Sequence, residues 1–307
     1  MLGVVCERNM SPDEIIIPDI LPPSEDGVFK ALLTRPGSEP VLRSVIRSFL
    51  RIPVRTVSVR NPELPIASGS EKQERFDVNC ITDSGEQVDV EMQAVAMPGD
   101  TLANKHAGLR SRMTYNLCDL HAKQDGKGKE YIVLCSSFLL LLCDFTVFDN
   151  VTDYIHHFSL RDKYGNSFCD KIGVTVAELT KLKNILLKPV AEMSDDEIWS
   201  VFFRCANRKE YSALIRSITS RKEEINMANE ILMSISQDEV ELAHFRSRRM
   251  FQMDMDHGLA VSRREGREEG IGIGRQETAR IMLADNEPLD KIARYTGLSQ
   301  SEIENLQ

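Results

Sequence analysis

The chain has 307 residues, of which 42% are hydrophobic and 28% charged, a composition typical of a globular protein with a sizeable core. Its formal net charge of −9 excludes a protein that coats nucleic acid by bulk electrostatics, so any DNA contact requires a local basic surface. The seven cysteines contain no C-x-x-C pair. This spacing excludes a zinc ribbon or a disulfide framework and favours free thiols in the cytoplasm.

Two helices are predicted near the N-terminus, after a lead that lacks the long apolar run of a signal peptide. The first has Asp26 in its opening turn, where a carboxylate interacts favourably with the positive end of the helix. Its apolar residues recur at helical spacing: Val28, Phe29, Leu32 and Leu33. The second covers about residues 40–50 and ends before Pro53. A short strand at residues 54–60 and a loop containing Lys72 follow.

A β-hairpin is predicted between residues 75 and 93, with Asp83-Ser84-Gly85 as its turn. Apolar residues alternate along both strands with a polar set: Asp77, Asn79, Asp89, Glu91 and Gln93. Antiparallel pairing would bring Asp77 beside Glu91, and such close carboxylates repel unless a cation lies between them. The hairpin therefore predicts a Mg²⁺ site. The same alternation would also arise if the carboxylates merely solvated an exposed sheet face.

A long helix is predicted from Thr101 to about Lys123. One broad face of it is formed by Leu102, His106, Leu109, Met113, Asn116, Leu117 and Leu120. Arg112 and Tyr115 are three residues apart and therefore share a face. They could hold a phosphate and stack on a base or sugar. Alternatively, Arg112 pairs with a core carboxylate and the ring of Tyr115 is buried.

The segment 132–143 is the most apolar part of the chain. It is too short to span a bilayer and is predicted to be a buried central strand, so no membrane association is expected. Residues 156–162 are predicted to form a strand at a sheet edge. Their two histidines could suggest a metal site, but no third ligand lies nearby at metal spacing, so the structural interpretation is favoured. The pattern after Lys183 is helical, and a capping box begins a helix at Ser194.

The glycines of residues 266–274 predict a flexible linker. The last segment has helix-turn-helix spacing with Gly297 at the turn. Residues 299–307 contain no Arg or Lys, so we expect packing or homo-oligomerisation through the C-terminal helices and not DNA reading.

Three segments occur together in order: Asp26-Gly-Val-Phe-Lys30, then Asp77 ahead of Glu91-Met92-Gln93, then Arg112-Met-Thr-Tyr115. This ordered set resembles the recombination-promoting nuclease and transposase family of the PD-(D/E)XK, or restriction-endonuclease-like, superfamily. The resemblance implies an α/β fold, with a mixed sheet of four or five strands flanked by helices and a helical C-terminal extension. It implies a nuclease-like domain at 1–190, a helical region at 191–260, and a Gly-containing linker with short C-terminal helices at 261–307.

The resemblance also implies a Mg²⁺-dependent DNA endonuclease linked to recombination or mobile elements, with Mn²⁺ as a substitute. The residues that match the family's site would have these roles: Asp77, Glu91 and the carbonyl of Met92 bind metal, Gln93 orients water, and Asp26 completes the acidic cluster. Lys72, Arg112 and Tyr115 would contact DNA, although for Lys72 the sequence slightly favours the alternative of a solvated lysine.

Gln93 stands where the wider superfamily usually carries lysine. A lysine brings positive charge to the water and the phosphate, whereas an amide only forms hydrogen bonds. The alternative hypothesis is therefore a catalytically weak or inactive nuclease-fold protein that acts as a DNA- or protein-binding module.

Overall fold

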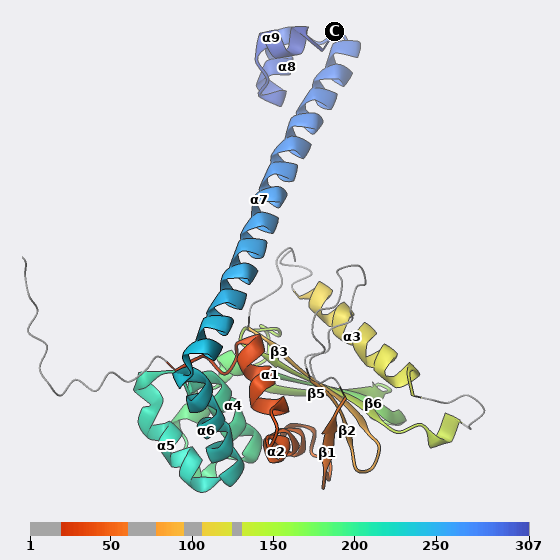
Figure 1. Cartoon of the computed structure of the whole chain (residues 1–307). Coiled ribbons are helices and arrows are strands. Elements are labelled where there is room, and N and C mark those ends of the chain that lie inside the picture. Colours follow the sequence, from red (N-terminus) through yellow and green to blue (C-terminus); the bar gives the residue numbers. More distant parts are fainter. Residues whose placement is uncertain (1–19, 61–77, 95–105, 125–130, 307) are drawn as a thin grey trace, which may run out of the picture. The chain divides into compact units, whose positions relative to one another are not determined.

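The computed structural model describes residues 20–60, 78–94, 106–124 and 131–306. Two compact units make up the chain, one extending to Leu242 and one from Ala243 onward. The first unit contains a mixed β-sheet with helices on its faces (Figure 1). The predicted α/β fold with a helical C-terminal part is confirmed.

Six strands form the sheet within the described residues, in the spatial order β1-β2-β3-β4-β6-β5. Their bounds are β1 Val57–Val59, β2 Val78–Thr82, β3 Gln87–Gln93, β4 Ser137–Cys143, β5 Ile155–Arg161 and β6 Ser167–Glu178. β3, β4 and β6 pair in parallel, and the other neighbours are antiparallel. The second half of the apolar stretch is the central strand β4, and β5 lies at the edge, as predicted. The predicted strand is wrong at its start, because residues 131–133 form a short 3₁₀ helix in which Ile132 is 76% exposed. β6 is an additional strand that the sequence did not indicate.

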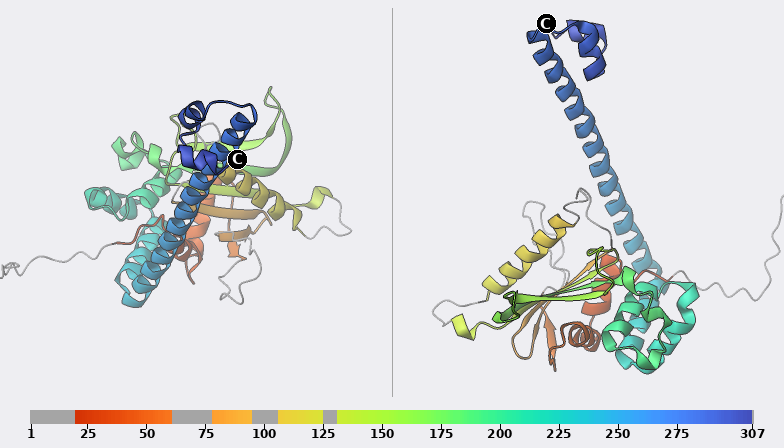
Figure 2. Two further views of the ribbon diagram at one scale, coloured as in Figure 1. Left: turned by 90° about the horizontal axis from the view of Figure 1, so that it is seen from above. Right: turned by 180° about the vertical axis from the view of Figure 1, so that it is seen from behind.

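Helices cover both faces of this sheet (Figure 2). α1 (Asp26–Thr34) and α2 (Glu39–Leu50) lie on one face, and their buried residues are those at the predicted helical spacing. α3 (Ala107–Ala122) lies on the other face and connects β3 to the parallel strand β4, as a parallel pair requires. Both faces of the central strands are therefore covered.

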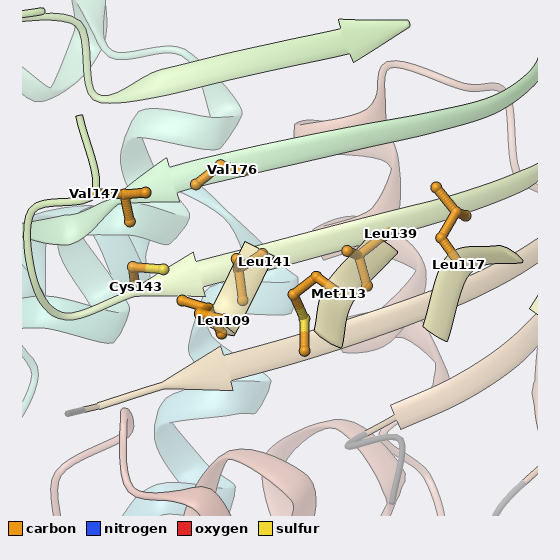
Figure 3. Packing of buried hydrophobic residues seen from close by; sticks show 8 residues of the cluster. All are labelled: Leu109, Met113, Leu117, Leu139, Leu141, Cys143, Val147 and Val176. Atoms are coloured by element: carbon orange, nitrogen blue, oxygen red, sulfur yellow. The ribbon is translucent and has the colours of Figure 1, made fainter. Parts of the chain in front are cut away.

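The cluster between α3 and the sheet is shown in Figure 3. It consists of Leu109, Met113 and Leu117 from α3 with Leu139, Leu141, Cys143, Val147 and Val176. Fully burying a leucine side chain contributes about 1.5–3 kcal/mol. This cluster fixes α3 over β4 and hence over the neighbouring strand β3.

Two further helices, α4 (Asp195–Cys205) and α6 (Glu223–Gln237), pack against α2, and α6 also contacts α1. α5 (Ser212–Arg221) packs against α4 and α6. Short 3₁₀ helices occupy residues 131–133, 179–181, 185–187, 190–192 and 209–211. The indole nitrogen of Trp199 in α4 donates a hydrogen bond to Ser44 Oγ of α2 at 3.1 Å. The predicted capping box of Ser194 and Glu197 begins α4.

The C-terminal part contains α7 (Glu239–Ala284), α8 (Leu289–Thr296) and α9 (Gln300–Glu304). The linker predicted at residues 266–274 is wrong in its secondary structure, because these glycines lie within α7. The stretch has no proline, and the Arg and Glu residues around its glycines are good helix formers. Gly297 ends α8 with φ +70°, so the predicted turn is confirmed. None of the helices in the described ranges is long and apolar enough to cross a membrane.

The small unit formed by the last helices has its own core. Ala279, Ile292 and Ile303 are fully buried in it. The capping box of Ser299 with Glu302 begins α9.

Glu178, at the end of β6, is a fully buried carboxylate with several partners. It accepts hydrogen bonds from the backbone N–H groups of Val147 and Phe148. Lys181 Nζ lies 2.6 Å and His156 Nε2 2.9 Å from its Oε2. Glu178 therefore fixes the segment after β4 to the end of β6.

Glu178→Gln should lower the free energy of unfolding by about 3–5 kcal/mol, because Lys181 loses the carboxylate that compensates its buried charge. Urea unfolding measures the loss. The control is Asp170→Asn, which removes the exposed ion pair with Arg161 and should cost at most about 1 kcal/mol. Equal losses in the two variants would contradict the role of Glu178.

Gly85→Ala should destabilise the chain more than Gly165→Ala. Both glycines have left-handed backbones, with φ of +87° and +89°, and both donate their N–H three residues back at 3.0 Å. The left-handed conformation should cost each alanine about 1–2 kcal/mol. A Cβ at Gly85 would also lie 2.7 Å from Cys135 Sγ, whereas Gly165 has nothing within 4 Å. Thermal unfolding compares the two variants. Equal decreases in melting temperature would show that the Cys135 side chain moves aside at little energetic cost.

Candidate active site

The predicted hairpin is confirmed over its described residues. β2 and β3 pair antiparallel, with Val78 opposite Val90 and Cys80 opposite Val88. These four apolar side chains are all fully buried. In the turn, the Asp83 carboxylate accepts hydrogen bonds from two backbone N–H groups of the segment before β1, which lowers the pKa of Asp83.

The polar face of β3 is buried as well. Asp89 is 0% and Glu91 2% exposed, and in the parallel register they lie beside Leu139 and Leu141 of β4. They are therefore on the face that α3 covers. The alternative in which carboxylates merely solvate an open sheet face is wrong for Asp89 and Glu91.

The charge of Asp89 affects its surroundings. Burial and the nearby Asp89 carboxylate raise the pKa of the Cys80 thiol. A carboxylate taken out of water is costly unless polar or charged groups compensate it. The burial of Asp89 and Glu91 on this strand therefore depends on the polar groups around them.

Gln93 connects Glu91 to the end of the neighbouring strand. Its Nε2 donates to Glu91 Oε2 at 3.5 Å, and its backbone carbonyl accepts the N–H of Asp144 at 2.9 Å. An amide that donates through Nε2 keeps Oε1 as an acceptor. The pair of Glu91 and Gln93 thus presents carboxylate and amide oxygens at the carboxyl end of β3.

Asp144 follows β4 at the same edge and forms an ion pair with Arg204 of α4. Burial raises the pKa of Asp144, while Arg204 and Arg208 oppose that shift. This pair joins the end of β4 to the helical layer. Sequence reasoning did not single out either residue, because they are 60 positions apart.

The remaining predicted site residues lie in different surroundings. Asp26 forms an ion pair with Lys30 at 3.5 Å, and its side chain is 68% exposed. Arg112 is exposed, and Tyr115 is 60% exposed. The predicted alternative in which the Tyr115 ring is buried is therefore wrong. Asp77 and Lys72 lie outside the described residues.

Sequence reasoning assigned His106 to the apolar face of its helix, and the structure shows an unusual histidine there. It is 2% exposed and precedes α3 with φ +60°. Its ring stacks on Phe145 with centroids 4.8 Å apart. Neither ring nitrogen has a hydrogen-bond partner among the described residues. Leaving a buried polar group unsatisfied costs about 1–3 kcal/mol.

The donors at the end of β3 suit a hard divalent cation, which prefers carboxylate and carbonyl oxygens. Glu91 supplies a buried carboxylate, and Met92 and Gln93 add backbone or amide oxygens on the same strand end. Within the described parts of the chain, no three His, Cys, Asp or Glu side chains gather closely enough to hold a metal. The described set therefore fits part of a metal site.

Comparison with known proteins gives a family. The family described as PD-(D/E)XK nuclease family transposase matches residues 23–262, which include the hairpin, α3 and the sheet. Searches of curated proteins and of solved structures found no match. The buried carboxylate of Glu91 and the sheet order thus lie within the matched region, and the chain belongs to the PD-(D/E)XK nuclease family transposases.

Proposed function

We propose that this chain is a metal-dependent DNA endonuclease that hydrolyses phosphodiester bonds. The observation that carries the proposal is the buried Glu91 carboxylate bonded to the Gln93 amide on β3. Membership of a nuclease family supports it. Mg²⁺ is the proposed ion and Mn²⁺ its substitute, because both are bound by oxygen ligands.

Asp77 and Glu91 are the proposed metal ligands, together with the backbone carbonyl of Met92. The support for Asp77 is its place in the sequence, directly before β2 in the family-like pattern. A bound divalent cation would neutralise charge on the phosphate and lower the pKa of a coordinated water. The Glu91 carboxylate is already buried away from solvent. Its attraction to a cation would be strong there, because the effective dielectric constant is low.

Gln93 is proposed to orient the attacking water. Because its Nε2 donates to Glu91, its Oε1 can accept a hydrogen bond from the water. An amide does not take up a proton at neutral pH, so Gln93 does not act as the base. The proton therefore leaves through a carboxylate or bulk water.

DNA is the proposed substrate, held by Arg112 and Tyr115 on the outer side of α3 and by Lys72. Exposure of Arg112 and Tyr115 leaves them accessible to a phosphate and a base or sugar. Such local contacts are required because the chain as a whole is acidic. Asp26 is proposed to complete the acidic cluster at the metal. To do so, it would have to give up its ion pair with Lys30.

The family points to recombination or mobile elements as the setting, in the cytoplasm. A homo-oligomer through the C-terminal helices belongs to the same proposal, because paired sites suit cleavage of two strands. The exposed apolar residues of α7, among them Phe251 and Leu259, are candidates for such contacts.

Plasmid nicking by the full chain should occur with Mg²⁺ or Mn²⁺ and stop with EDTA. Glu91→Gln keeps the side-chain shape but removes the charge, and should reduce nicking about 100-fold or more, as should Asp77→Asn. Gel separation of nicked and supercoiled plasmid measures the rate. The matched control is Glu86→Gln, which makes the same change in the residue directly before β3, at the strand end far from Glu91.

Nicking that survives in Glu91→Gln and Asp77→Asn would refute this site. Absence of nicking with every metal tested, in folded protein, would favour the alternative, a DNA- or protein-binding module in which Gln93 replaces the catalytic lysine. Circular dichroism of each variant establishes that the protein is folded.

A further inference from the structure

We propose that His106 and the amino-terminal end of α3 form an oxyanion subsite that binds a phosphate of the nucleic acid. The inference rests on the proposed function, since it places this phosphate next to Glu91 and Gln93. It adds a substrate-binding residue that the sequence pattern did not indicate.

The first support is the state of the His106 side chain. His106 is only 2% exposed, yet neither ring nitrogen donates or accepts a hydrogen bond among the described residues. A buried polar group in a native protein normally has a partner, so such an exception indicates a ligand that is absent. The backbone of His106 is also left-handed, a conformation uncommon outside glycine and associated with functional sites.

The second support is position. The His106 ring stacks on Phe145, and the residue before Phe145 donates its N–H to the Gln93 carbonyl. Cys143 is the register partner of Gln93, and Leu141 that of Glu91. Figure 3 shows Leu109, from the first turn of α3, beside these two β4 residues. His106 therefore lies at the same end and on the same face of the sheet as Glu91.

The third support is electrostatic and selects an anion as the ligand. The amino-terminal end of a helix carries partial positive charge and backbone N–H groups that lack helical partners. α3 has 16 residues, no side-chain cap and no acidic residue in its first turn. A cation would be disfavoured here, whereas an oxyanion would be bound by N–H groups and by the imidazole N–H.

The two parts of the site depend on each other. Glu91 would repel a phosphate in the absence of a cation, so the subsite works together with the proposed metal. Glu91 and His106 are each 2% exposed. The proposal therefore requires the side chains that cover them to move when a phosphodiester binds.

The test uses the full chain with Ca²⁺ and a 12-base-pair fluorescent DNA duplex, and anisotropy gives Kd. His106→Phe keeps an aromatic ring against Phe145 but removes both nitrogens, and should weaken binding about 10- to 100-fold. Its melting temperature should be unchanged or higher, since no hydrogen bond is lost. The matched control is His121→Phe on the same helix, which loses the contact with Ser137 Oγ and should keep the parent Kd.

A second readout reports on the imidazole itself. Histidine ring ¹⁵N spectra recorded during titration with dimethyl phosphate and Ca²⁺ should show shifts of the His106 signals and none of His121. If His106→Phe fails to fold, His106→Asn replaces it, because asparagine tolerates the left-handed backbone.

Parent-like DNA affinity in the folded variant, together with unshifted His106 signals, would overturn the subsite. Metal-dependent nicking by that same variant would then leave the proposed nuclease standing. Conversely, His106-dependent binding by a chain that fails to nick with any metal would retain the subsite and refute the nuclease.

Discussion

The burial of the Asp89 and Glu91 carboxylates between β3 and α3 is the constraint on which the candidate site depends. Charged groups in the interior are costly, so the surrounding fold has to hold them in place. It does so by enclosing β3 on both sides: apolar residues face α1 and α2, and polar residues face α3. The crossover through α3 makes this enclosure a consequence of the parallel pairing of β3 with β4.

Stability has to come from parts of the fold that carry no site residue. The aromatic contacts of Trp199 with Phe202 and Phe203, and of Phe29 with Phe203, lie in the helical layer behind the sheet. The ion pair of Asp144 with Arg204 of that layer and the carboxylate of Glu178 fix the segment that follows β4. That segment carries Phe145, on which His106 stacks. These aromatic contacts and buried charges thus surround the polar carboxyl end of β3.

Local patterns predicted much of this fold. The hairpin turn at Gly85 and the buried faces of α1 to α3 follow from spacing of two or of 3.6 residues, which nearby sequence determines. Burial of Glu91 could not be predicted, because alternation does not tell whether the polar face is covered. β6 was missed because its first half, residues 167–172, does not alternate between apolar and polar residues. His106 was assigned to the apolar face of a predicted helix, where spacing alone indicates packing. It is distinguished by its left-handed backbone and by ring nitrogens that have no hydrogen-bond partner among the described residues.

Calorimetric titration of the full chain with Mn²⁺ tests the central claim, that the Glu91 end of β3 is a metal site, without requiring catalysis. One binding site of micromolar to millimolar Kd is expected, typical of oxygen-ligated divalent ions. Glu91→Gln should weaken it at least about tenfold, since a carboxylate ligand loses its charge, and Glu86→Gln should leave it unchanged. Equal Mn²⁺ affinity in the parent and in Glu91→Gln would contradict the account.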